Sequence, residues 1–295
     1  MMFVIIHHCS MPYLILNGSE WVKDLYCIIM PFTMSTFTMI SGYFHKEKPI
    51  MDRINSYLIP CLLFSILNIC LQRFSLVSYI YDMPFYRFGY AMWYLYVLFV
   101  YNIITQILMK KISVAILLCC SIILALSICS IPTFKAEYLQ FSRLVSHYPF
   151  FLIGIILHKK QWLKIREHKH IRWLALFIFV VFLLGNLMLC KYTGQLHFTP
   201  AFDHPVSPSI ELYGLILCSI LSICLLLFVP NKEYTITRWG GQTLTPYVLH
   251  MSLILPICWT FGISYMNMWY GMVIYMVITP VLCLLLFNVG LTNSK

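Results

Sequence analysis

"IRWLALFIFVVFLLGNLMLC", residues 171–190, contains one arginine and one asparagine, and nearly all its other residues are apolar. Its apolar residues cover every side of a helix and do not alternate with polar ones. Because a helix rises about 1.5 Å per residue, such a run crosses about 30 Å of hydrocarbon. A barrel strand would alternate apolar and polar residues over about ten positions. The stretch therefore predicts a membrane-spanning α-helix.

Similar apolar runs recur along the whole chain of 295 residues, of which 61% are hydrophobic and 10% charged. This composition excludes a soluble domain. We predict an all-α, polytopic integral membrane protein with about ten transmembrane helices in a single domain, residues 1–295. The predicted segments are 1–16, 24–44, 54–71, 90–109, 112–131, 144–157, 171–190, 209–229, 244–262 and 267–291.

The distribution of lysine and arginine predicts the orientation. The loops after the second, fourth, sixth and eighth predicted segments, with the C-terminal tail, hold fourteen of the twenty basic residues. Since cytoplasmic loops are enriched in these residues, we expect a multi-pass protein of the cytoplasmic membrane with both termini inside. The most basic loop, "HKKQWLKIREHKHIR" (158–172), is a topology signal or else a site for an anionic cofactor or lipid headgroup.

Several common chemical motifs are missing from the sequence. Most of the twelve cysteines lie inside apolar segments, and none forms a CxxC pair or a zinc-like spacing with histidine. Gly240 and Gly241 fit a helix break better than a phosphate-binding loop. We therefore expect no metal, no disulfide framework and no nucleic-acid partner, and we expect membrane lipids to surround the chain.

The second predicted segment carries the first specific pattern, "FTMSTFTMISGYF", residues 32–44. Its serine and threonine hydroxyls can bond to carbonyls of the preceding turn or face a polar cavity. Gly42 permits a neighbouring helix to approach closely. The order of residues resembles a motif of the membrane acyltransferase 3 family, which includes polysaccharide O-acetylases and fucose 4-O-acetylase-like proteins. The ISGYF end, residues 40–44, matches the family motif. Thr33 occupies the position of the motif's histidine, and Ser35 occupies the position of its proline.

Further stretches resemble motifs of that family in the same order along the chain. They are "RINSYLIP" (53–60), "MWYLYVLF" (92–99), "YPFFLIGIIL" (148–157) and "GGQTLTPYVLHMSL" (240–253). The resemblance therefore spans nearly the whole chain.

Two adjacent histidines lie in "VIIHHCS", residues 4–10, which resembles the end of the family's first helix with His8 at the histidine position. The resemblance implies that His8 is a general base, a role for which a pKa near 6.5 is well suited. His7 lies about 100° away on the helix, so the two rings cannot face one cavity centre. The family's basic residue, eleven positions before this histidine, has no counterpart, because seven residues precede His8. We expect either that this N-terminus is short or that the basic residue, and with it activity, is lost.

The resemblance implies acetyl-CoA as the donor and a carbohydrate or lipid-linked glycan as the acceptor. His250 is a second catalytic candidate, because ionisable groups inside a membrane usually line a functional interior, although a packing role is the alternative. Glu211 lies at a segment edge, where it could hold an acceptor hydroxyl or orient a histidine. His147 is interpreted as marking a helix end. The candidate contacts of the donor are Arg53, Lys46, Lys48, Ser41 and Gly42, and those of the substrate are Trp93 and Tyr247.

The function implied is transfer of an acetyl group to a hydroxyl of a cell-surface carbohydrate or its lipid-linked precursor. One alternative is a transporter or flippase of glycan precursors, which predicts two repeat-related halves. No convincing repeat relates residues 1–150 to 151–295. The other alternative is a degenerate, non-catalytic acyltransferase relative.

Overall fold

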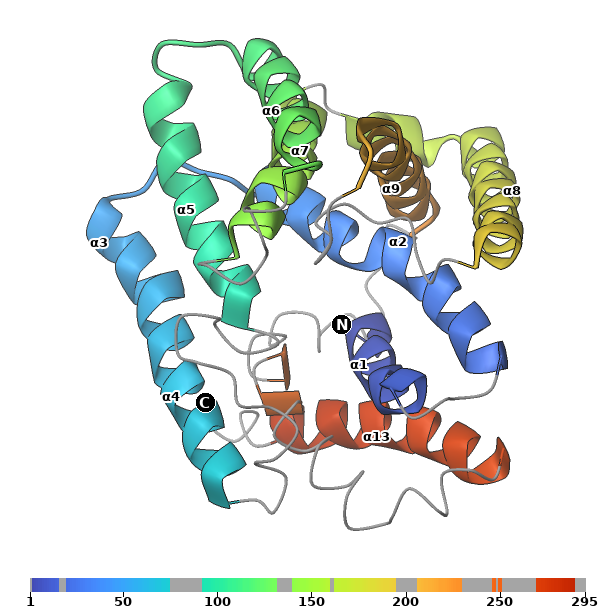
Figure 1. Ribbon diagram of the computed structural model, residues 1–295. Helices are drawn as coiled ribbons and strands as arrows, with labels where there is room; N and C mark the ends of the chain where they lie inside the picture. The colour runs from blue at the N-terminus through green and yellow to red at the C-terminus, as the bar shows by residue number, and fades with distance from the viewer. Residues whose placement is uncertain are drawn as a thin grey trace.

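The structure, a computed structural model, describes residues 2–15, 20–74, 92–131, 140–159, 162–194, 206–229, 246–247, 249–250 and 269–289. Within these ranges the regular elements are helical, which confirms the predicted all-α class (Figure 1). A π-helical turn (Ile54–Leu58) leads into α4, and a 3₁₀ turn (Trp162–Glu167) precedes α8. The α-helices are α1 (Met2–Ile15), α2 (Glu20–Tyr43), α3 (Ile50–Arg53), α4 (Ile59–Phe74), α5 (Met92–Leu108), α6 (Val114–Ile128), α7 (Phe141–Lys159), α8 (Lys169–Thr193), α9 (Pro208–Phe228) and α13 (Trp269–Val289).

Nine of the ten predicted segments coincide with these helices, within a few residues at each end. The remaining segment, 244–262, lies outside the described residues except at 246–247 and 249–250. Five described segments are long and apolar enough to cross a membrane, and further apolar helices are shorter. The count of ten spans therefore stays a prediction.

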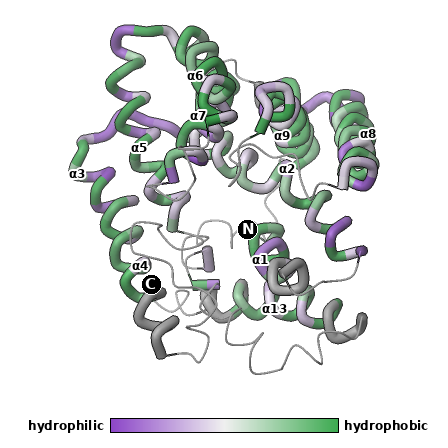
Figure 2. Tube along the Cα trace, viewed as in Figure 1, coloured by the Kyte–Doolittle hydropathy of each residue, from purple (hydrophilic) through white to green (hydrophobic). Residues whose placement is uncertain are grey.

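Most of α8, apart from its two ends, consists of hydrophobic residues (Figure 2). Leu174, Phe177, Val181, Leu184 and Met188 are all exposed. Soluble proteins rarely expose a continuous apolar patch of this kind, whereas a helix facing lipid requires one. The helix lengths and this surface identify a membrane protein.

Helix α2 crosses the middle of the molecule and packs against α1, α7, α8 and α9 (Figure 1). Its closest neighbour is α7. A Cβ atom added at Gly42 would lie 1.9 Å from the Phe151 carbonyl oxygen, and one at Gly154 would lie 2.0 Å from the Met39 carbonyl oxygen. The two glycines thus allow the backbones to touch, as expected for close helix packing in membranes.

Three hydroxyl groups of α2 bond to the carbonyl oxygens of their own helix, whereas the buried Thr36 hydroxyl has no hydrogen-bond partner among the described residues. Thr33, Ser35 and Thr38 each donate to the carbonyl oxygen four residues earlier, which is the bonding expected from the sequence for Ser35 and Thr38. The Ser35 hydroxyl also lies 2.8 Å from that of Ser222, which links α2 to α9.

Contacts at the helix ends agree with the predicted topology, in which successive segments cross the membrane in opposite directions. The Arg172 guanidinium at the start of α8 donates to the Phe228 carbonyl oxygen at the end of α9, over 3.4 Å. At the other end of α8, Lys191 Nζ lies 2.8 Å from Asp24 Oδ2 near the start of α2. The starts of α2 and α9 therefore lie towards the same side, opposite the start of α8.

The assignment of sides can be tested with two single cysteines in a cysteine-depleted background. Lys164 lies in the basic loop before α8, and Ser209 lies in the first turn of α9; both are exposed. Because the basic loop is predicted to be cytoplasmic, an impermeant thiol reagent should label Ser209→Cys in intact cells and spare Lys164→Cys. The reverse pattern would invert the topology, and permeabilised cells should label both.

Candidate active site

Two candidate histidines from opposite ends of the chain meet in the structure. The ring centroids of His8, on α1, and His250 lie 5.0 Å apart, with the ring planes at 44°. His250 is completely buried, and His8 is half-buried. The fold thus pairs the two histidines that the sequence singled out for catalysis.

The hydrogen bonding of His250 defines its tautomer. Its Nδ1 lies 3.2 Å from the Pro246 carbonyl oxygen, which can only accept, so we assign the ring proton to Nδ1. The Nε2 atom then carries a lone pair, and it has no hydrogen-bond partner among the described residues. The Nδ1 atom of His8 is likewise without a partner there. The pair therefore holds two buried ring nitrogens without a hydrogen-bond partner among the described residues.

His7 has different surroundings from His8. Its ring centroid lies 4.7 Å from that of Tyr26 on α2 and 5.0 Å from that of His8. The Ser10 hydroxyl donates to the His7 carbonyl oxygen over 2.6 Å. The His7 ring therefore packs between the rings of Tyr26 and His8.

A line of aromatic and hydroxyl side chains leads from the histidine pair to the end of α2. The Tyr247 ring lies 6.0 Å from that of His250 and 5.8 Å from that of Tyr94. The Tyr94 hydroxyl in turn lies 2.9 Å from the Ser41 hydroxyl. The fold thus connects Ser41 and Tyr247 to the histidines through Tyr94, a residue that no sequence pattern marks as functional.

A cationic side chain also belongs to this region. The Arg143 guanidinium lies over the Trp93 ring, with Cζ 5.0 Å from the centroid, as in a cation–π contact. The His147 ring lies 5.6 Å from that of Trp93. Arg143 is also close enough to His8 and Tyr247 to act on both electrostatically. Trp93 is therefore linked to the histidine pair through Arg143, which no sequence pattern singles out, and through Tyr94 and Tyr247.

Arg143 was missed because the sixth segment was predicted to begin at residue 144, which left this arginine in a loop. Helix α7 in fact begins at Phe141, so Arg143 and His147 lie one turn apart on the same helix. That spacing places both side chains on one face. The four-residue spacing of Arg143 and His147 is the feature of the sequence that could have indicated this shared face.

Glu211 is buried at the start of α9. It is 1% exposed, in the first turn of α9, and its carboxyl group interacts with Ser146 on α7. Neither carboxyl oxygen has a hydrogen-bond partner of good geometry among the described residues. The contacts described for Glu211 do not include His8 or His250, so they give no support to the expected role of orienting a histidine.

The basic end of α2 is held by a buried arginine. Arg53 is 2% exposed, and its guanidinium donates to the carbonyl oxygens of Lys46, over 3.0 Å, and Lys48, over 3.4 Å. It also donates to Gln106 Oε1 on α5. Arg53 thus clamps the loop between α2 and α3, while the side chains of Lys46 and Lys48 are exposed.

Two other groups complete this end of the molecule. Burial lowers the pKa of His45, and nearby Arg53 lowers it further, although a hydrogen bond to Asn102 opposes the shift. The His45 ring is therefore neutral at pH 7, which leaves the lysines as the exposed cations of the loop. Gly42, a candidate contact of the donor, lies in the contact of α2 with α7, where the Phe151 backbone adjoins it.

Comparison with known proteins agrees with the motifs. A family model described as an acyltransferase domain matches residues 1–288, almost the whole chain. No curated protein and no solved structure matches the chain. The matched region includes His8 and His250, the side chains that lead from Tyr247 to Ser41, and the loop that carries Lys46 and Lys48. The chain therefore belongs to the acyltransferase 3 family, whose motifs its sequence resembles.

Proposed function

We propose that this membrane protein transfers an acetyl group from acetyl-CoA to a hydroxyl of a cell-surface carbohydrate or its lipid-linked precursor. The observation that carries the proposal is the contact between His8 and His250, at 5.0 Å between ring centroids. Imidazole is the side chain best suited to exchange a proton near neutral pH. Membership of an acyltransferase family supports acyl transfer as the reaction.

The proposed reaction uses the pair as one unit. The acceptor oxygen attacks the thioester carbonyl carbon while His8 takes the hydroxyl proton. The carbon–sulfur bond then breaks, CoA leaves as a thiolate, and this thiolate receives the proton from His8. An ester and free CoA result, and the imidazole is again neutral. His250, whose ring is anchored to the Pro246 carbonyl oxygen, positions His8.

The donor is proposed to enter from the basic end of α2. Lys46 and Lys48 are exposed there and can pair with the phosphates of CoA, while Arg53 holds their loop in place. From Ser41 to the level of Tyr26, beside the histidines, the distance along α2 is about 22 Å at about 1.5 Å per residue. Tyr94 and Tyr247 lie between these two points and could line the route of the acyl group.

The acceptor is proposed to bind beside the pair, near Trp93. This ring lies next to Tyr94, with 5.9 Å between centroids, and beneath Arg143. Trp93 and Tyr247 supply flat aromatic surface, and Arg143 supplies hydrogen-bond donors. An aromatic surface with fixed polar groups is the usual composition of a small-molecule site.

The proposal can be tested with radiolabelled acetyl-CoA and membranes that contain or lack the protein. Label should appear in the glycan fraction only when the protein is present, and mild alkali should release it, as expected for an ester. Glycan that crosses the membrane without acquiring label would indicate a transporter. Neither label nor movement would indicate a non-catalytic relative.

The donor site predicts a specific change in KM. The double replacement Lys46→Ala with Lys48→Ala should raise KM for acetyl-CoA about tenfold and leave kcat nearly unchanged, because charge-assisted hydrogen bonds contribute about 1.5–3 kcal/mol and exposure reduces this. The matched control is Lys110→Ala with Lys111→Ala, two exposed lysines after α5. Equal changes in KM from both double variants would exclude the loop as the phosphate site.

A further inference from the structure

Two buried cysteines from different helices contact each other in the structure. Cys27, on α2, is 4% exposed, and Cys190, near the end of α8, is 3% exposed. The two side chains form a small buried cluster, and their thiol groups are hydrogen-bonded to each other. More than half of the chain separates them in sequence, so the fold alone brings the two sulfur atoms together.

Contacts on either side hold the two cysteines opposite each other. Lys191 directly follows Cys190, and its Nζ lies 2.8 Å from Asp24 Oδ2. Asp24 precedes Cys27 by one turn of α2. Asn186, one turn before Cys190, donates from its amide to the Cys27 carbonyl oxygen over 3.1 Å. Since residues three or four apart share one face of a helix, each cysteine lies on the face that its helix presents to the other.

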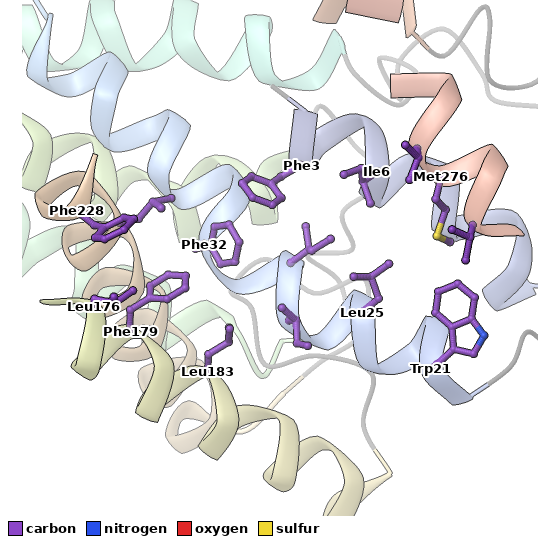
Figure 3. Close-up of a pocket in the computed structure, with 15 residues that line it drawn as sticks. Phe3, Ile6, Trp21, Leu25, Phe32, Leu176, Phe179, Leu183, Phe228 and Met276 are labelled. Atoms are coloured by element: carbon purple, nitrogen blue, oxygen red, sulfur yellow. The ribbon is translucent and has the colours of Figure 1, made fainter. Parts of the chain in front are cut away.

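The packing of α2 on α8 continues beyond the cysteines. The Phe32 ring, on α2, and the Phe179 ring, on α8, lie 5.4 Å apart (Figure 3). Phe32 follows Cys27 along its helix, whereas Phe179 precedes Cys190 along its own. The two helices therefore run antiparallel here, and the sulfur atoms lie between an ion pair and a ring contact that join the same two helices.

The cysteine pair lies towards the external side in the predicted topology. Cys190 is near the end of α8, and the basic loop before the start of that helix is predicted to be cytoplasmic. The charged side chains of Glu20, Lys23 and Lys191 are exposed nearby, as at the boundary between membrane and water. Cytoplasmic thiols are kept reduced, whereas compartments outside the cytoplasm are oxidising and allow disulfides to persist.

We infer that Cys27 and Cys190 become joined by a disulfide that ties α8 to α2. Both are thiols in the structure, and their contact is the step that precedes the bond. The inference does not depend on the proposed function. A single cross-link also needs no regular spacing of cysteines, which is the feature by which a disulfide framework is recognised in a sequence.

The reaction is a thiol–disulfide exchange with a disulfide-bearing oxidant of the external compartment. One protein thiolate attacks a sulfur of the oxidant, which forms a mixed disulfide and releases one oxidant thiol. The other protein thiolate attacks the protein sulfur of the mixed disulfide, the protein S–S bond forms, and the second oxidant thiol leaves. Two electrons and two protons thus pass from the protein thiols to the oxidant. Because both sulfurs are buried in the folded protein, the exchange takes place before α8 has fully packed on α2.

Mass spectrometry of the full-length protein tests the inference. Cells are quenched in acid, and free thiols are alkylated in denaturant so that no further exchange occurs. Digestion without reductant should yield the Cys27 peptide linked to the Cys190 peptide in most molecules, and reduction should separate the two. Recovery of both peptides in alkylated form from most molecules would overturn the inference.

The unfolding temperature provides a second readout. A reductant should lower that of the detergent-solubilised wild type by at least about 5 °C, because a cross-link across a long stretch of chain restricts the unfolded state. The reductant should have no effect on the double variant Cys27→Ser with Cys190→Ser. The matched control is Cys218→Ser with Cys224→Ser, two buried cysteines of α9, which should respond as wild type does. A wild type that unfolds at the same temperature with and without reductant would overturn the inference.

Discussion

His8→Ala should lower kcat for acyl transfer at least about a hundredfold, because a positioned general base contributes typically about 10²- to 10⁴-fold. The loss should appear in kcat, since the ring acts on the hydroxyl proton in the transition state. The measurement is transfer of labelled acetyl from acetyl-CoA to the glycan fraction, with membranes that hold wild type and variant at matched expression.

His7→Ala is the matched control, since it removes the same ring from the adjacent position. His7 packs on Tyr26 and should tolerate the change with most activity retained. If His7→Ala is inactive and His8→Ala is active, the catalytic position is displaced by one residue. If both variants remain active, the histidines are structural.

Gly42→Ala should destabilise the protein severely. The added Cβ would lie 1.9 Å from the carbonyl oxygen of Phe151 and 2.8 Å from its carbonyl carbon, both backbone atoms that cannot rotate away. Overpacking typically costs about 1–3 kcal/mol, and a clash between backbones should exceed this range. The measurement is the thermal unfolding of the detergent-solubilised protein, together with the yield of folded protein.

Gly185→Ala provides the control, because a Cβ there meets nothing within 4 Å. Alanine favours a helix over glycine by about 0.5–1 kcal/mol, so this variant should unfold at the same temperature or slightly above wild type. Equal unfolding temperatures for the two variants would contradict the close contact of α2 with α7.

The helices could be predicted because hydropathy depends on local composition alone. The run at 171–190 has polar residues only near its ends, and it lies inside α8. The predicted start of α7 is wrong for the same reason, that hydropathy depends on local composition alone. Ser142 and Arg143 lower the hydropathy of its first turn, so hydropathy places the start at residue 144 whereas the helix begins at Phe141.

The site could be predicted only in part. His8 and His250 were recognisable singly, because an ionisable group in an apolar run is unusual. Their contact depends on how α1 packs with a segment more than two hundred residues away, which no local pattern encodes. Arg53 shows the same limit, since the sequence gives its charge but does not show that loop carbonyls engage the guanidinium.

His8 and His250 are proposed to act as one catalytic unit, which a double-mutant cycle can test. Acetyl transfer is measured for wild type, His8→Ala, His250→Ala and the double variant. If the pair acts as a unit, the double variant should be no slower than the slower single variant, because removal of either ring already disables the other. Losses that multiply in the double variant would show that the two histidines act independently and would rule out a single catalytic unit.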